Sequence, residues 1–371
     1  MKFNLLLRYA VVSIFIFSIS FAGKTIFEKD TAPLPGGDDD KPAEEVYKNI
    51  QVLKGMPKKH LHDVMNFMRA SLGVGCKFCH VYTESTKTWN WESDDMEEKQ
   101  TARKMITMVK QVNKDYFDGN NAVTCFSCHQ GSTHTNRTPP LPQHLPDMTE
   151  TPRDTNLPSA ETILDTYRKA LGNIDAVKSA SSRVSKGTVT TFDGKQFDIE
   201  VYNGAPNKYL QVISGANGKM MKGFDGTSGW QMDQRGTGDL DGYQLEQVTV
   251  YADFAGDFDL GSKYSKIQTL GKDTVKGKTT YVVRAIIDEN RNERLYFDTE
   301  TGLLVRRKVF VKTMIGNVPA QTDFSDYRQV QGVMLPFEVR YSYIDPWSET
   351  YRKYSEVSLN TSLDKISFTK P

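Results

Sequence analysis

The sequence predicts an α+β protein of several domains, with a mostly helical N-terminal part and a C-terminal antiparallel, curved sheet (an open barrel) preceded by one helix. Its 371 residues exceed what one hydrophobic core usually serves. Apolar residues recur at helical spacing before residue 138 but fall in short strand-like runs after residue 180. A proline-rich stretch, 138–158, separates the two patterns and is predicted to be a linker.

The chain begins with the features of a secretory signal peptide, residues 1–22. A lysine at position 2 precedes an apolar run over 10–21, and small residues flank the expected cleavage site after Ala22. Arg8 leaves the apolar run shorter than a membrane-spanning helix requires. We therefore expect export to the bacterial periplasm or the outer side of the inner membrane, with an uncleaved anchor as the alternative. Residues 23–43 are predicted to form a flexible leader.

Amphipathic helices are predicted within the first domain, residues 44–137. Apolar residues of the segment 61–72 recur at i, i+3, i+4 and i+7, and Gly73 ends the pattern. A second stripe runs over 102–116, with Ser93 or Asp94 as its expected N-cap. A shorter helix is expected over 44–53. The two long helices each precede one copy of a cysteine motif.

That motif is C-x-x-C-H, and its two copies are Cys76-Lys77-Phe78-Cys79-His80 and Cys125-Phe126-Ser127-Cys128-His129. The pattern fixes a haem through two thioethers while the histidine ligates the iron. The four cysteines are thus predicted to bind two haem c groups covalently, and His80 and His129 to ligate iron. A four-cysteine zinc ribbon is the alternative, but it needs no histidine after each pair. The motifs use every cysteine of the chain, so none remains for a disulfide.

Methionines on the preceding helices are candidates for the second axial ligand. Met65 and Met68 precede the first motif, and Met105 and Met108 the second. A thioether ligand raises the reduction potential of a haem. We predict Met65 for the first iron and Met105 for the second, with Met108 as the alternative. Without haem, a methionine on an apolar stripe fills the core.

Four histidines outside the motifs offer another second ligand: His60, His62, His134 and His144. Two histidine ligands would lower the reduction potential. His134 is the strongest of the four, because it follows the second motif closely. An iron with an exchangeable site would instead indicate a dihaem peroxidase.

The N-terminal domain resembles the tetrahaem cytochrome subunit of photosynthetic reaction centres. The resemblance rests on residues 71–80, 108–113 and 123–131, and covers about 46–140, one two-haem half of that subunit. It implies a methionine ligand from the helix before each motif, which supports Met65 and Met105. One haem of that family takes a distant histidine instead. Since this chain has two motifs where the family has four, a role in photosynthesis does not follow.

The C-terminal domain, residues 159–371, begins with a predicted helix at 160–171. Strand-like runs separated by turn residues follow it. They are 188–192, 197–202, 209–213, 247–251, 279–287, 294–297, 303–311, 321–327, 334–343 and 350–359. Sequential strands with short turns favour an antiparallel, curved sheet.

This domain is similar to the open barrels of bacterial lipoprotein carriers. The similarity covers about 160–368 and rests on the segments 206–208, 229–230, 326–328 and 332–336. It implies a concave face that shelters an acyl chain, so a lipid or apolar ligand is one expectation. We prefer the expectation that this domain is a docking or structural module, because a fold alone does not determine function.

Together these features favour a periplasmic electron carrier over an enzyme. Two haem groups would pass single electrons from a redox protein donor to an acceptor. A membrane-bound electron-transfer complex is one candidate for either partner. The alternative is a lipid or lipoprotein carrier, or an envelope-assembly factor, with redox-sensing haems. A net charge of +1 gives no support to nucleic-acid binding. No catalytic constellation can be picked from the scattered carboxylates.

Overall fold

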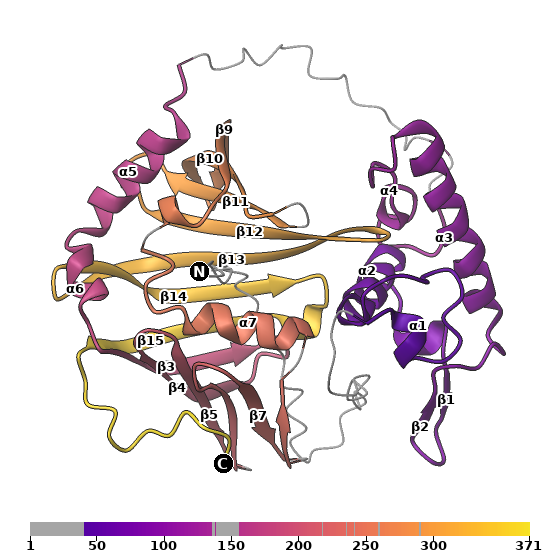
Figure 1. Cartoon of the computed structure of the whole chain (residues 1–371), viewed down its shortest axis with the longest axis horizontal. Helices are drawn as coiled ribbons and strands as arrows, with labels where there is room; N and C mark the ends of the chain where they lie inside the picture. The colour runs from indigo at the N-terminus through magenta and orange to yellow at the C-terminus, as the bar shows by residue number, and fades with distance from the viewer. Residues whose placement is uncertain are drawn as a thin grey trace, which may run out of the picture. The chain divides into compact units, whose positions relative to one another are not determined.

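The computed structural model describes residues 41–135, 138, 156–216, 218–234, 236–240, 242–258, 260–288 and 291–371. The chain divides into two compact units, each described separately below (Figure 1). The helical unit is the described part of Asp38–Thr155 together with Val311–Val318, and the sheet unit is Asn156–Phe310 with Pro319–Pro371. The predicted signal peptide, nearly all of the leader and most of the linker lie outside the described residues.

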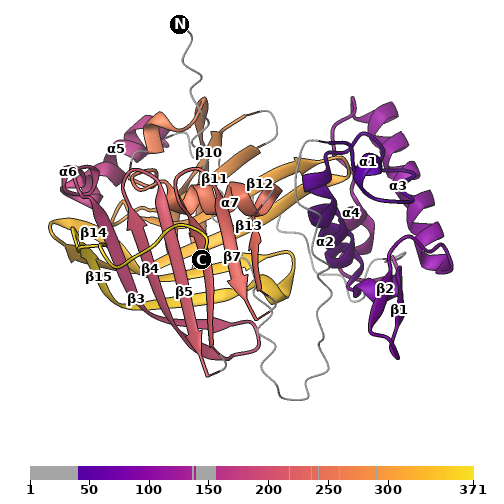
Figure 2. The same ribbon diagram turned by 60° about the horizontal axis from the view of Figure 1, so that its bottom comes forward.

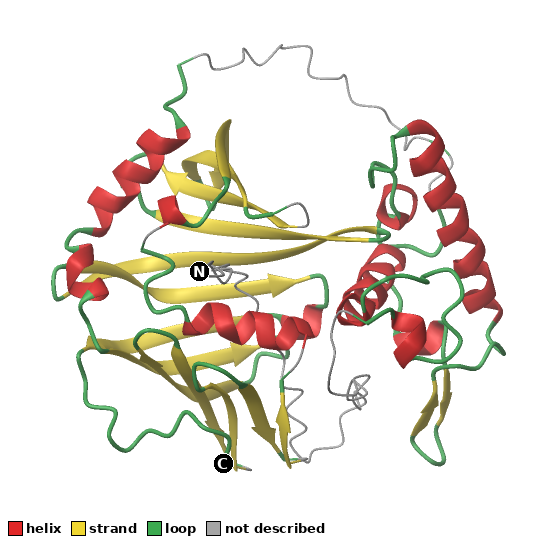
Figure 3. Cartoon of the chain, viewed as in Figure 1, coloured by secondary structure: helices red, strands yellow, loops and turns green. Residues whose placement is uncertain are grey.

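Short and long helices build the helical unit, with one small hairpin (Figure 3). Its elements are α1 (Ala43–Val46), η1 (Lys58–His60), α2 (Leu61–Leu72), η2 (Cys76–Phe78), β1 (Val81–Thr83), β2 (Thr88–Asn90), α3 (Glu97–Tyr116) and α4 (Cys125–His129). Helix α2 has the predicted bounds, and Gly73 ends it in the left-handed conformation at φ 68°. Among the described residues, no helix is both long and apolar enough to cross a membrane.

Two helix boundaries of this unit differ from the prediction. Helix α3 begins at Glu97 and is preceded by Met96, so neither Ser93 nor Asp94 caps it. The Asp94 carboxylate instead accepts a hydrogen bond from Asn49 Nδ2 at 2.8 Å and pairs with Arg103 at 2.8 Å. Helix α1 ends at Val46, although the sequence predicted a helix to about residue 53. Near residue 53 the chain has turned back toward α1. The carboxylate of Glu44 accepts from the Gly55 N–H there, which a continuous helix could not allow.

The sheet unit confirms the predicted curved antiparallel sheet with a leading helix. Its helices are α5 (Ala160–Leu171), α6 (Ile174–Lys178), α7 (Gly242–Ala252), η3 (Leu260–Ser262) and η4 (Pro346–Ser348). Its strands are β3 (Ser182–Thr191), β4 (Gln196–Gly204), β5 (Lys208–Gly215), β6 (Gly218–Phe224), β7 (Gly229–Asp233), β8 (Gly236–Asp239), β9 (Lys266–Val275), β10 (Lys278–Ile286), β11 (Arg291–Asp298), β12 (Leu304–Thr313), β13 (Gly316–Val330), β14 (Val333–Tyr343) and β15 (Thr350–Leu359). Helix α5 has the bounds predicted from its periodicity, and Ser159 Oγ caps it by accepting from the Thr162 N–H.

One continuous sheet joins these strands in the order β8-β7-β6-β5-β4-β3-β15-β14-β13-β12-β11-β10-β9. The C-terminal strand β15 pairs with β3 and so joins the two ends of the unit's sequence in the middle of the sheet. Strands β8 and β9 are its edges, and the sheet curves without closing (Figure 2). Helix α5 packs on apolar residues of β10 to β14, and α7 covers β5 to β7.

Helix α7 overturns the predicted strand at 247–251. The run Gln-Val-Thr-Val-Tyr is rich in residues that favour strands. In the structure it lies inside an eleven-residue helix whose buried residues Val248 and Ala252 are one turn apart. Both side chains join a core cluster with Val189 and Ile199 of the sheet. Burial of this helix face against the concave sheet therefore outweighs the local strand preference.

The edge of the sheet near β7 depends on a glycine. A methyl group at Gly223 would lie 2.4 Å from the indole of Trp230, which is 1% exposed and whose Nε1 donates to the Phe368 carbonyl. Substitution Gly223→Ala should therefore lower the free energy of unfolding of the sheet unit by about 1–3 kcal/mol through overpacking. Denaturant titration followed by tryptophan fluorescence measures this loss.

A matched control is Gly238→Ala in the neighbouring strand β8, where a methyl group meets nothing within 4 Å. It should leave the stability nearly unchanged. Equal stability of both variants and the native chain would show that Trp230 moves aside without cost.

Candidate haem sites

The first motif lies in the turn that follows α2. Gly73 and Gly75 carry the chain from the helix end into η2, which holds the two cysteines of the motif at its start and just after its end. The Cys79 and His80 N–H groups both donate to the Cys76 carbonyl. The two thiols are therefore held in one tight turn, as thioether bonds to the two vinyl groups of a haem require.

A backbone carbonyl orients the ring of His80. Its Nδ1 lies 3.1 Å from the carbonyl oxygen of Trp91, and the imidazole packs edge-on against the Trp91 indole at 5.1 Å. A carbonyl only accepts, so Nδ1 carries the proton and Nε2 keeps its lone pair for a metal. Burial, assisted by the charge of Lys99, lowers the pKa of His80, which keeps the ring in its neutral, ligating form.

Lys99 of α3 shares the Trp91 carbonyl. Its ammonium group donates to the carbonyl oxygens of Trp91 at 2.9 Å and Ser93 at 2.7 Å. The Trp91 oxygen therefore accepts from both Lys99 and His80, and the two hydrogen bonds compete for its electron density. The first site thus has a positive charge one carbonyl away from its histidine.

The second motif forms helix α4 and repeats the same arrangement. Thr124 precedes it and exchanges hydrogen bonds with Ser127 in a capping box. Nδ1 of His129 lies 3.0 Å from the carbonyl oxygen of Ser132, so Nε2 of this ring is also left for a metal. Buried Asn113 of α3 holds the approach to the motif, because its amide donates to the Val123 carbonyl and accepts from the Val123 N–H.

The end of α2 touches the turn that follows α4. The Gly131 N–H donates to the Ser71 carbonyl at 2.9 Å, and a side chain at Gly73 would clash with the Gly131 carbonyl. Gly73 is thus required both for its left-handed φ and for this close approach. The contact fixes the second motif against the helix that leads into the first.

The four cysteines are divided between the two motifs, Cys76 and Cys79 in one and Cys125 and Cys128 in the other. No group of three or more His, Cys, Asp or Glu side chains in the described part of the chain is placed to hold a metal ion. The residues fit two C-x-x-C-H haem attachments, with both histidines already turned for ligation.

The methionine candidates occupy two different settings. Met65 and Met68 are half-buried on α2, beside its buried face. Met105 and Met108 of α3 are 39% and 47% exposed. Exposing apolar side chains of a helix to water is unfavourable in free energy. A helix face of this kind therefore suits an apolar partner such as a haem ring. The choice between Met105 and Met108 stays a prediction.

The other candidate histidines have separate environments. Nδ1 of His62 accepts from the Asn66 amide on α2, and burial followed by the charge of Arg69 lowers the pKa of His62 to about 4. His134 is exposed and bonded to Thr133. His60 lies in η1, and His144 falls outside the described residues.

Sequence reasoning did not identify the carbonyls of Trp91 and Ser132 or the ammonium of Lys99. Every residue has a carbonyl, so no residue type marks one that orients a histidine. Lys99 lies on the polar side of a charged helix among other lysines. The unusual Trp89-Asn90-Trp91 was a signal, since the two stacked indoles, 4.3 Å apart, form the wall beside His80.

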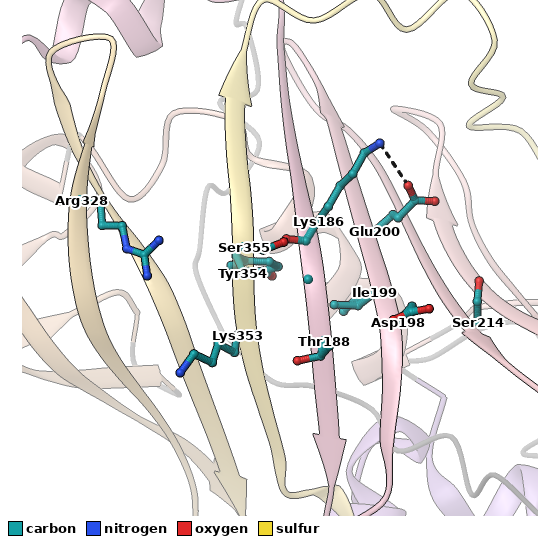
Figure 4. A pocket seen from close by; sticks show the side chains of 11 residues that line it. Lys186, Thr188, Asp198, Ile199, Glu200, Ser214, Arg328, Lys353, Tyr354 and Ser355 are labelled. Carbon is teal, nitrogen blue, oxygen red and sulfur yellow. Dashed lines mark hydrogen bonds and ion pairs between the residues drawn. The ribbon is translucent and has the colours of Figure 1, made fainter.

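The sheet unit carries an open surface pocket of about 780 Å³ on strands β3, β4 and β15 (Figure 4). Each long cation that lines it is paired with a carboxylate. Lys186 pairs with Glu200, Lys353 with Glu338, and Arg328 with Asp326. This pocket therefore presents no unpaired lysine or arginine to a ligand.

The helical unit resembles cytochromes of the c type. Residues 23–161 match the family model of the photosynthetic reaction centre cytochrome c subunit. The resemblance predicted from the sequence is thereby confirmed for the N-terminal part of the chain.

Two relatives show the extent of the similarity. The reaction centre cytochrome c subunit of Thermochromatium tepidum is 36% identical over 110 residues, which cover 27% of this chain and 24% of that protein. Cytochrome c-554 of Chloroflexus aurantiacus is 30% identical over 136 residues, 33% of this chain and 30% of that protein. The chain thus spans only a quarter to a third of the length of these relatives.

Solved structures with some likeness to the sheet unit include two bacterial proteins. A DUF1329 family protein from Desulfovibrio piger covers 56% of this chain and 96% of its own, at 13% identity and a TM-score of 0.41. A LolA superfamily protein from Nitrosomonas europaea covers 58% and 99%, at 14% identity and a TM-score of 0.39. These scores are low, so neither likeness carries information on function.

The methionine ligands can be assigned by spectroscopy. The near-infrared spectrum of the oxidised protein distinguishes methionine and histidine ligation from ligation by two histidines. We expect Met65→Ala to remove the methionine signature of the first haem and Met105→Ala that of the second, because each deletes the coordinating thioether.

Met108→Ala is the matched control, since it removes a neighbouring exposed methionine of the same helix. It should leave both signatures in place. Loss of a signature in this variant, with its retention in Met105→Ala, would move the ligand to Met108.

Proposed function

We propose that this protein is a dihaem c-type cytochrome that passes single electrons between redox partners outside the bacterial inner membrane. The observation that carries the proposal is the repeated unit of helix, turn and C-x-x-C-H in which both histidines have Nδ1 bonded to a carbonyl and Nε2 left for iron. The similarity to cytochromes c over residues 23–161 supports it. Bound haem would supply a reversible one-electron couple.

The chain's own residues would hold and adjust the two haem groups. Cys76, Cys79, Cys125 and Cys128 would form the thioethers, and His80 and His129 would be the first axial ligands. Met65 would complete the first site, and Met105 or Met108 the second. Carbonyl hydrogen bonds to both Nδ1 atoms fix the rings and increase their basicity, which adjusts the potential of each site.

The sheet unit would serve as a docking or ligand-binding module for this electron carrier. The electron donor and acceptor of the protein would be redox proteins, and one of them would be part of a membrane-bound electron-transfer complex. The signal peptide predicted at 1–22 supports export, which covalent haem attachment in bacteria requires. The alternative role, a lipid or lipoprotein carrier with redox-sensing haems, would require a ligand bound by the sheet unit.

Haem stoichiometry tests the proposal. Purified full-length protein should contain two covalent haem groups by the pyridine haemochrome assay and mass spectrometry. The double substitution Cys125→Ala with Cys128→Ala should reduce this to one, as should the corresponding change at Cys76 and Cys79, because each pair forms the thioethers of its own site.

A redox titration of the native protein should show reversible one-electron couples. A protein with fewer than two haems, or with no reversible couple, would contradict the proposed function. Unchanged spectra with peroxide or carbon monoxide would exclude a dihaem peroxidase.

The position of Lys99 predicts an asymmetry between the two sites. Lys99→Met removes a charged hydrogen bond from the Trp91 carbonyl, so the His80 Nδ1–H bond to that oxygen strengthens and the histidine donates more electron density to its iron. Loss of a positive charge acts in the same direction. Such a hydrogen bond contributes about 1 kcal/mol. For a one-electron couple this energy corresponds to a fall of roughly 40 mV in the midpoint potential of the first haem.

Lys104→Met is the control, because it removes the same charge from an exposed position of α3. Redox titration should show a clearly smaller change there, and little change at the second haem in either variant. Equal shifts for Lys99→Met and Lys104→Met would show that the carbonyl contact plays no part.

A further inference from the structure

A buried arginine of the sheet unit lacks a carboxylate partner. Arg352 lies on the concave side of β15 and is 6% exposed. Its guanidinium donates to Gln211 Oε1 at 2.6 Å and to the Tyr354 hydroxyl at 3.5 Å, and it lies 5.8 Å from the ring centroid of Tyr251. Among the described residues no carboxylate pairs with it. These neutral groups orient the charge but do not neutralise it.

A second buried cation stands beside the same glutamine. Lys222 on β6 is 3% exposed and pairs in register with Gln211 on β5, so both side chains lie on the same face of the sheet. Burial, together with the charge of Arg352, lowers the pKa of Lys222 to about 7. Burial also raises the pKa of nearby Tyr209 to about 12, so this phenol stays neutral at physiological pH.

The other buried arginine of the unit is balanced in the ordinary way. Arg307 on β12 is fully buried and pairs with Asp257 at 2.9 Å and Glu293 at 3.4 Å. The fold therefore neutralises one interior arginine with two carboxylates and leaves the other with neutral partners. Because an unneutralised buried ion costs several kcal/mol, the difference needs a cause.

Polar groups around Arg352 also have hydrogen-bonding capacity left over. Its own Nε, the amide of Gln247 and the hydroxyl of Thr350 are buried and have no partner in the described part of the chain. Thr350 is two residues before Arg352 on the same strand face, and Gln247 is one helical turn before Tyr251 on α7. The neighbouring side chains are apolar, including Val189 and Val248.

We propose that the interior of the sheet unit is an oxyanion-binding site centred on Arg352, with Lys222, Gln247 and Thr350 as further donors. A phosphate or carboxylate group would neutralise the guanidinium, in the planar geometry that arginine favours, and accept from the unpartnered groups of Gln247 and Thr350. Water could satisfy the donors but could not balance the charge. The oxyanion is either a free ion or the head group of a lipid whose chain lies among the apolar side chains. This inference concerns the sheet unit alone and does not rest on the proposed electron transfer.

Equilibrium dialysis of the full-length holoprotein tests the proposal with two probes, radiolabelled inorganic phosphate and radiolabelled oleate below its micellar concentration. We expect one equivalent of at least one probe to bind. Arg352→Met should weaken that binding at least tenfold, because it removes the central charge and keeps an unbranched apolar side chain. Arg284→Met, at an exposed position of β10, is the matched control and should bind like the native chain.

The two probes distinguish the sources of the oxyanion. If phosphate binds, and oleate either competes with it or does not bind, the oxyanion is the free ion. If only oleate binds, the oxyanion is a lipid head group. If Arg352→Met does not fold, Lys222→Met and Gln247→Leu provide the same comparison. Failure of both probes to bind the native protein, or binding that is equal in the native chain and all three interior variants, would overturn the proposal.

Discussion

The hydrogen bond from each motif histidine to a backbone carbonyl is the constraint on which the helical unit depends. It places the proton of His80 and of His129 on Nδ1 and leaves both Nε2 lone pairs available to a metal. The acceptors come from segments after each motif, so the loop that carries Trp91 and the turn that carries Ser132 must fold back onto their rings. The stacked tryptophans and the bonds of Lys99 hold the first of these segments in place.

The two units treat charge and apolar surface in opposite ways. The helical unit leaves Met105 and Met108 exposed on α3, a surface that a haem would cover. The sheet unit instead buries cations inside its curved sheet. Arg307 is balanced by carboxylates and Arg352 is not. These groups are the reason for the two proposals, a haem at the helical unit and an oxyanion in the sheet unit.

Local signals predicted helices better than strands. Helices α2 and α5 have the expected bounds because periodicity and end signals, Gly73 and Ser159, agree within one short segment. Strands β6 to β9 were not predicted; β6 to β8 are short and contain glycine, so their sequences show little alternation. The run 247–251 was predicted as a strand and is a helix, because its residues favour a strand locally while burial under the concave sheet selects a helix.

The sequence by itself determined which atoms can attach haem, because C-x-x-C-H is a continuous motif whose chemistry depends only on neighbouring residues. Only the tertiary structure decided how the histidine rings are turned, because their carbonyl partners have no residue-specific mark. The same holds for Arg352 and Gln211, which are 141 residues apart and meet only when β15 and β5 enter one sheet. Covalent attachment is local in sequence, whereas orientation and charge balance arise from contacts between distant segments.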